Sequence, residues 1–126
     1  SKDAEYQVYE LTDSIQKRDG RSMAILEELL GKNDAGYLVL VIGALFANFS
    51  RMYAVKTAGL SAAELAKKLK VKEYAVKMSA KNGARFSAEQ VARAMEMIND
   101  TEYRFKSGAL AADVAVRQIV LKLLTL

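Results

Sequence analysis

AGYLVLVIGALFANFS, residues 35–50, is a run of sixteen residues without a charged side chain. A helix formed by this run would be apolar or neutral on every side, so we expect most of its circumference to be buried against other helices. The predicted helix runs from Ala35 to Thr57 after a cap at Asn33 or Asp34. Its most apolar part, Tyr37 to Ala47, is shorter than the roughly 20 residues that cross a bilayer. We therefore expect this segment to be the central helix of the domain.

The rest of the chain also carries apolar residues at helical spacing, which predicts an all-α bundle of about seven helices. There is no proline. Two capping boxes, Ser61 with Glu64 and Ser87 with Gln90, indicate where two of the helices begin. Gly31 is expected just past the end of the second helix. The expected bounds are about 4–18, 22–30, 35–57, 61–69, 73–81, 87–107 and 110–124.

The composition excludes several kinds of chemistry. The chain has no cysteine and no histidine, so disulfides, zinc sites built on these residues and histidine-dependent nucleophiles are absent. No glycine pattern of a phosphate-binding or dinucleotide-binding loop occurs. We therefore expect no catalytic, cofactor-binding or metal-binding residues and no enzymatic activity. The opening residues SKDAEYQVYE carry charge where a signal peptide would be apolar, which predicts a cytoplasmic protein.

Two arginines lie in otherwise apolar helices. Arg51 directly follows the uncharged run, and Arg117 lies within VAVRQIVLKLL, residues 114–124. A cation in such a place must extend to solvent, pair with an acid, or contact a partner molecule. Extension to solvent is the simpler explanation, and both residues are also candidates for a contact with another subunit.

Residues 59–80, GLSAAELAKKLKVKEYAVKMSA, have the pattern of a helix-turn-helix hairpin. Residues 61–85 contain seven Lys or Arg against two acids, so the positive charge of the chain is concentrated here. In a DNA-binding protein, Lys72, Lys77 and Lys81 would contact phosphates.

Several features of the hairpin weaken the DNA-binding interpretation. Lys70 stands at the turn, where the motif usually has glycine, and Ser79 stands where an apolar packing residue is expected. The second helix has no Arg, Asn or Gln before Asn82, and these are the side chains that read base edges best. Lysines alone would give weak, salt-sensitive affinity for any sequence.

A series of motifs covers nearly the whole chain in order. It comprises VYELTDSIQKRD, AILEELL, FSRMYAVKTAGLS, ELAKKLKVKEYAVK, RFSAEQVARAMEMI and TEYRFKSGAL. This series resembles the C-terminal helical region of the delta subunit of bacterial DNA polymerase III, a clamp-loader subunit. The most specific pieces are LKVKEYAVK and EYRFKSG; in the second, Glu102, Lys106 and Gly108 match a family pattern that usually begins with Asp.

The resemblance implies a collar domain that joins the ring of clamp-loader subunits. It implies that residues 1–20 form a helix leading out of a preceding lid domain and that residues 21–126 form the collar. The partners would be other clamp-loader subunits, with DNA contacted only indirectly or weakly, no membrane, and a monomeric isolated fragment. Arg51, Lys106 and Arg117 are the candidate interface residues. The alternative is an autonomous helix-turn-helix regulator that contacts DNA through Lys72, Lys77 and Lys81.

Overall fold

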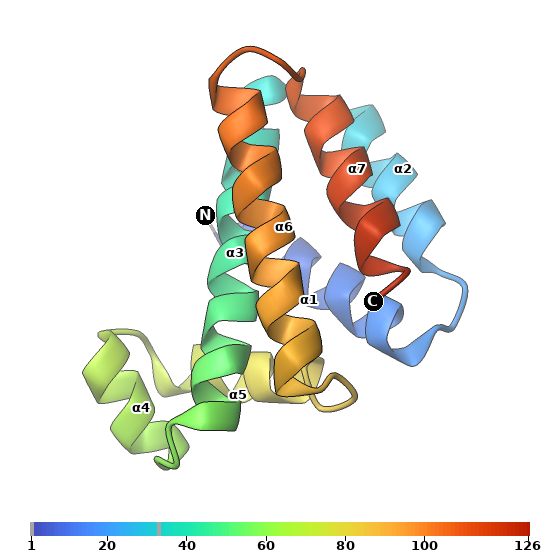
Figure 1. Cartoon of the computed structure of the whole chain (residues 1–126). Coiled ribbons are helices and arrows are strands. Elements are labelled where there is room, and N and C mark those ends of the chain that lie inside the picture. Colours follow the sequence, from blue (N-terminus) through green and yellow to red (C-terminus); the bar gives the residue numbers. More distant parts are fainter. Residues whose placement is uncertain (1, 33) are drawn as a thin grey trace.

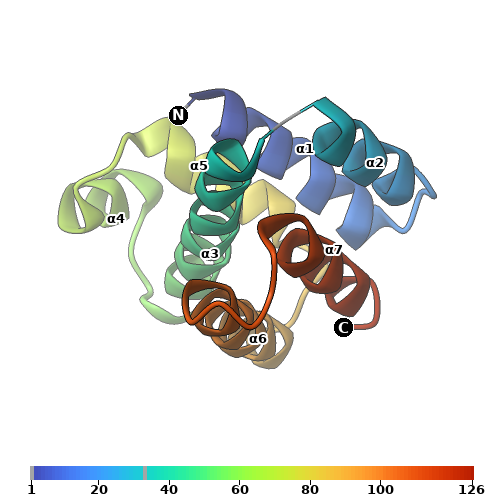
Figure 2. The ribbon, with the colours of Figure 1, turned by 90° about the horizontal axis from the view of Figure 1, so that it is seen from above.

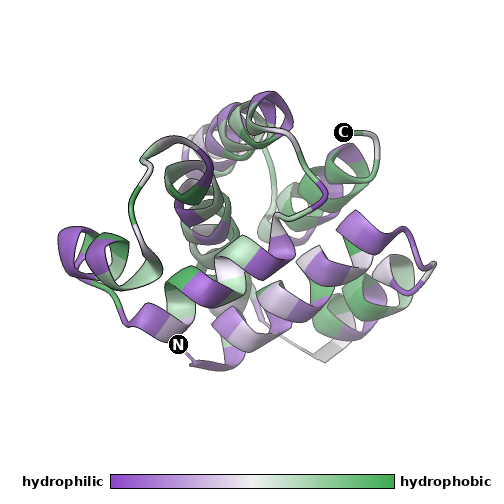
Figure 3. Ribbon diagram, turned by 90° about the horizontal axis from the view of Figure 1, so that it is seen from below, coloured by the Kyte–Doolittle hydropathy of each residue, from purple (hydrophilic) through white to green (hydrophobic). Residues whose placement is uncertain are grey.

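The structure, a computed structural model, describes residues 2–32 and 34–126. Within these residues the chain forms helices and no strand, which confirms the prediction of an all-α bundle (Figure 1). The helices are α1 (Lys2–Lys17), α2 (Ser22–Lys32), α3 (Ala35–Thr57), α4 (Ala62–Leu69), α5 (Glu73–Asn82), α6 (Ala88–Lys106) and α7 (Ala112–Leu123). Hydrophilic and hydrophobic residues alternate along them, as expected for helices with one buried face (Figure 3).

The central helix is α3, which packs against α1, α5, α6 and α7 and also touches α4. Viewed from above, it stands in the middle of the other helices (Figure 2). Its length and composition would also suffice to cross a bilayer, but here other helices of the same domain pack around it. The buried residues of α3 are Leu38, Val41, Ile42, Leu45, Asn48, Phe49 and Met52.

The expectation that α3 is buried around most of its circumference is only partly correct. Along one side of the helix, Val39, Ala44 and Ala47 are half-buried, Gly43 is exposed, and Leu40 is 48% exposed. An uncharged run carries no charged positions that would reveal which side faces solvent, and its polar Asn48 is buried, so this open side could not be recognised from the sequence.

The helix ends follow local capping interactions. Asp34 caps α3 by accepting a hydrogen bond from the backbone N–H of Tyr37 at 2.9 Å, whereas the other predicted cap, Asn33, lies outside the described residues. Both predicted capping boxes are present, at Ser61 and Ser87. The prediction for Gly31 was wrong, because α2 continues through this residue to Lys32.

The first helix contributes to the same core as the others. Ala4, Val8, Leu11 and Ile15 of α1 are buried in the main hydrophobic cluster, together with side chains from α3. The assignment of residues 1–20 to a connection from a preceding domain stays a prediction.

The hairpin formed by α4 and α5 has the expected helix-turn-helix-like form. Lys70 adopts the left-handed conformation, with φ 58° and ψ 44°, which the motif usually reserves for glycine. Leu65, Ala66 and Val76 form a small hydrophobic cluster of their own between the two helices. The hairpin therefore keeps its geometry even though the turn carries a lysine side chain.

A close approach at Gly83 joins the end of α5 to α3. A Cβ atom at Gly83 would lie 2.8 Å from Cγ and 3.2 Å from Cβ of Met52, which is fully buried. Lack of space therefore requires glycine here. The backbone conformation does not, because other residues also adopt a φ of −99°.

We predict that Gly83→Ala destabilises the domain by about 1–3 kcal/mol, because the added methyl group forces Met52 out of a filled core. Gly31→Ala is the matched control. It lies inside α2 with no atom within 4 Å of the added Cβ, so it should stabilise the helix by about 1 kcal/mol. Urea denaturation of the two variants measures both changes in the free energy of unfolding. Equal changes in the two variants would contradict the prediction.

Candidate interface groove on α3

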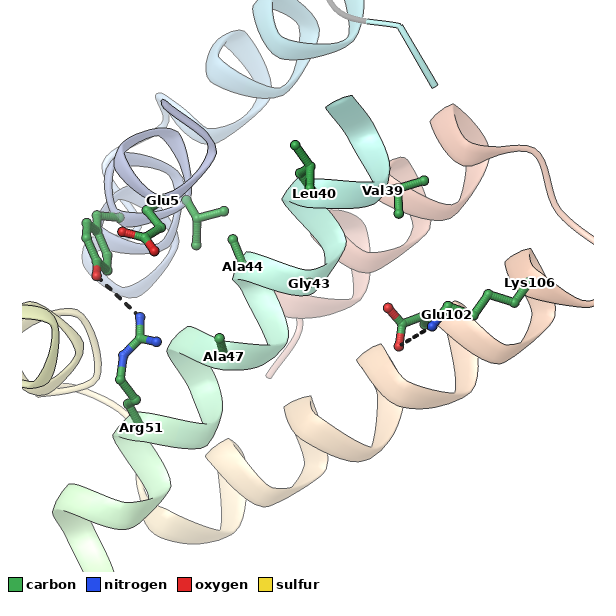
Figure 4. A pocket seen from close by; sticks show the side chains of 11 residues that line it. Glu5, Val39, Leu40, Gly43, Ala44, Ala47, Arg51, Glu102 and Lys106 are labelled. Atoms are coloured by element: carbon green, nitrogen blue, oxygen red, sulfur yellow. Dashed lines mark hydrogen bonds and ion pairs between the residues drawn. The ribbon is translucent and has the colours of Figure 1, made fainter. Parts of the chain in front are cut away.

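The open side of α3 forms the floor of a groove between α1 and α6, with a cavity of about 360 Å³ (Figure 4). Its α1 side is lined by Glu5, Val8 and Tyr9, and its α6 side by Glu102 and Lys106. We refer to it as the α3 groove, whose floor residues are Val39, Leu40, Gly43, Ala44 and Ala47, with Arg51 at its end. Within the described residues no group of three or more acidic side chains is placed to hold a metal ion.

The floor of the groove is uncharged until it reaches Arg51. Leu40, Gly43 and Ala47 are three or four residues apart and therefore share one face of the helix. Apart from the adjacent residues and backbone of α3 itself, no heavy atom lies within 4 Å of the place where a Cβ of Gly43 would stand. Because Gly43 has no side chain, the middle of the floor is open, and the backbone of α3 is accessible there to another chain.

Arg51 is half-buried and held by two hydrogen bonds. Its Nε donates to Oγ of Ser79 on α5 at 2.9 Å, and its Nη2 donates to the hydroxyl of Tyr9 on α1 at 3.3 Å (Figure 4). The hydroxyl of Ser79 donates in turn to Oδ1 of Asn48 at 2.7 Å, and Nδ2 of Asn48 donates to Oδ1 of Asn82 at 3.0 Å. This buried network joins α1, α3 and α5, and it explains why Ser79 replaces an apolar residue.

The partners of Arg51 are both neutral. Burial raises the pKa of the Tyr9 phenol, although the Arg51 charge opposes this shift, so the hydroxyl stays protonated at neutral pH. Glu5 lines the same side of the groove, but among the described residues no ion pair joins an acid to Arg51. A half-buried cation that forms no ion pair is a favourable binding site for a carboxylate of a partner molecule.

Lys106 lies on the opposite side of the groove. Its ammonium is 3.7 Å from a carboxylate oxygen of Glu102, one helical turn earlier, and the Lys106 side chain is largely exposed. Such a pair is worth only a few tenths of a kcal/mol, so Lys106 can exchange Glu102 for another partner at little cost. The groove therefore brings together two of the three predicted interface residues, Arg51 and Lys106.

The third predicted interface residue, Arg117, lies elsewhere. It is exposed on α7, and its two terminal nitrogens donate to both carboxylate oxygens of Glu27 on α2. The hydrogen bond from Arg117 lowers the pKa of Glu27 below its usual value. The charge of Arg117 is thus met within the domain, where it joins α2 to α7. Sequence reasoning missed Glu27 because it is 90 residues away along the chain.

Lys77 and Lys81 on α5 are exposed, and so is Lys72, the N-cap residue that directly precedes this helix. Lys77 forms an ion pair of 3.5 Å with Glu73, and this acid occupies the first turn of the helix. The opposite face of α5 is buried through Val76, Ser79 and Asn82. One face of α5, the helix that would contact DNA in the alternative interpretation, therefore packs the hairpin against α3.

The fold defines the class of the protein: an all-α helical-bundle domain that contains a helix-turn-helix-like hairpin. The family model of the DNA polymerase III delta subunit, C-terminal domain, matches residues 5–123. The chain therefore belongs to this family, as its motifs indicated.

A solved structure, the DNA clamp loader delta protein of Bacillus subtilis, has the same fold. It matches with a TM-score of 0.86 and 23% sequence identity, over 98% of this chain and 37% of that chain. The present chain thus spans just over a third of the length of that protein. No curated protein matches the sequence.

The buried network at Arg51 can be tested by mutation. We predict that Ser79→Ala destabilises the domain by about 1–3 kcal/mol, because it leaves Oδ1 of Asn48 and Nε of Arg51 without their partner. Ser107→Ala is the control, since this exposed hydroxyl bonds only to the carbonyl of Arg104, and its effect should stay within about 0.5 kcal/mol. Thermal unfolding of both variants distinguishes them. An unfolding temperature for Ser79→Ala equal to that of the control would mean that the network does not stabilise the domain.

Proposed function

We propose that this chain is a non-catalytic assembly domain of the delta subunit of a DNA polymerase III clamp loader. It would join the ring of subunits that loads the sliding clamp in DNA replication, in the cytoplasm of a bacterium. The observation that carries this proposal is the family match over residues 5–123. We further propose the domain division predicted from the sequence, with residues 1–20 leading out of a lid domain and residues 21–126 forming the collar.

The α3 groove supports an assembly function on physical grounds. Its uncharged floor can be removed from water without stripping a charge of its hydration. Arg51 and Lys106 stand on its borders, where charged groups select the partner and set its orientation. We therefore propose these two residues as interface residues, while Arg117 stays a prediction because Glu27 already neutralises it.

The alternative is a DNA-binding regulator that uses the α4–α5 hairpin. The geometry of the hairpin and the exposed Lys72, Lys77 and Lys81 favour it. Glu73 opposes it, because a carboxylate in the first turn of α5 would be repelled by the negative charge of the DNA. Lysines without base-reading side chains would give electrostatic affinity alone, so we propose that any contact with DNA is weak and indirect.

We predict that the purified chain co-elutes with the other collar-forming subunits of the clamp loader on size-exclusion chromatography and elutes as a monomer when alone. The full-length delta subunit of the same bacterium is the positive control. Failure of the chain to co-elute under conditions where full-length delta does so would refute the assembly proposal.

A binding assay tests the alternative. We predict that the chain retains duplexes of unrelated sequence equally weakly and releases them by about 200 mM salt, because only lysine–phosphate contacts are available. The double variant Lys77→Glu with Lys81→Glu should lose this retention and still co-elute with the clamp-loader subunits. A defined duplex that is retained at that salt concentration and lost in the double variant would instead favour the regulator.

A further inference from the structure

We propose that the α3 groove is the docking site for a helix of a neighbouring clamp-loader subunit, and that an acidic side chain of this helix pairs with Arg51. The inference rests on the proposed function, and it specifies which face of the domain makes the contact and with what chemistry.

The floor of the groove offers an apolar surface to a partner. Leu40 is 48% exposed, and it stands on a helix that has no charge over sixteen residues. Gly43 and Ala47 follow on the same face, so the surface beside Leu40 is low. A helix that packs here can bury Leu40 and approach the backbone of α3 closely, since the interaxial distance depends on the size of the side chains at the contact.

The dimensions of the floor suit a helix. Leu40 and Arg51 are 11 positions apart in α3, which at 1.5 Å per residue is roughly 16 Å, or three helical turns. The groove runs along α3 with α1 on one side and α6 on the other (Figure 4). Among the described residues there is no strand whose edge could accept an extended peptide, whereas a groove between helices accepts an amphipathic helix.

The charge of the occupant follows from Arg51. Its Nε and Nη2 are held by Ser79 and Tyr9, so the guanidinium is already positioned at the end of the groove before a partner arrives. Both of these partners are neutral, and the charge is left for an anion. A guanidinium binds a carboxylate through a charge-assisted hydrogen bond, which is stronger than a bond between neutral groups. Complementarity therefore predicts Asp or Glu on the docking helix opposite Arg51.

The groove has an acid of its own on the same side, Glu5, and this residue does not remove the need for a partner. Glu5 is exposed on α1 and lines the cavity, but no ion pair joins it to Arg51. On the other side, Glu102 is matched with Lys106 at 3.7 Å. Among the described residues, Glu5 and Arg51 are thus the two groove charges that no ion pair matches, and Arg51 is the cation with which an acidic side chain of the incoming helix would pair.

The test measures the affinity of the chain for the remaining clamp-loader subunits of the same bacterium. Gly43→Gln places a long neutral side chain on the floor of the groove, and Gly31→Gln places the same side chain on α2. Both glycines are exposed, helical and free of atoms within 4 Å of an added Cβ, so both variants should fold. We expect Gly43→Gln to weaken binding at least tenfold and Gly31→Gln to leave it unchanged.

A second pair of variants tests the charge. Arg51→Gln should weaken binding about tenfold and reduce its dependence on salt, because one ion pair is lost. Arg93→Gln, on a face of α6 that borders a separate cavity, should change neither. Unfolding curves for all four variants confirm that the comparison is made on folded protein.

The outcomes separate this inference from the proposed function. If the wild-type chain does not bind the subunits, both are overturned. If it binds and Gly43→Gln binds equally well, only the groove inference is overturned. Self-association of the wild-type chain that Gly43→Gln abolishes in the absence of other subunits would assign the groove to a second copy and would also overturn it.

Discussion

The removal of α3 from water is the constraint on which the rest of the structure depends. A helix with sixteen consecutive uncharged residues cannot stand in solvent, and each large apolar side chain that it buries contributes about 1.5–3 kcal/mol. The helices α1, α5, α6 and α7 all pack on it, and the contact between the rings of Phe49 and Phe86, 5.9 Å apart, adds the segment before α6. The groove is the one long side of α3 that this arrangement leaves uncovered in the described structure, and it retains the neutral character of the buried sides.

Polar groups inside this core decide how the hairpin is attached. An apolar contact between α3 and α5 would tolerate small shifts, whereas the hydrogen bonds of Asn48, Ser79 and Asn82 require one arrangement. Because Arg51 is the last member of the same network, the attachment of α5 also sets the position of the cation at the end of the groove. Stability of the fold and geometry of the candidate site are therefore coupled through Ser79.

The sequence predicted what is local. The bounds of α3 and α4 follow from capping residues and apolar spacing, and Arg51 was recognised as a charge out of place at the end of an uncharged run. The features that the sequence could not show depend on contacts between residues that are far apart in the chain. The groove exists because α1 and α6 stand apart over α3, and Arg117 is neutralised by a carboxylate that is remote in the chain. Gly31 was misread because a glycine inside a helix and one just past its end look alike in sequence.

We propose that the open side of α3 is covered by another subunit in the assembled clamp loader. The most direct test places a photo-crosslinking amino acid at position 40, where Leu40 reaches out of the groove floor, and irradiates the assembled complex. We expect a crosslink to a helical segment of a neighbouring subunit that contains an acidic residue. An assembled complex that gives no crosslink from position 40 to any other subunit would contradict it.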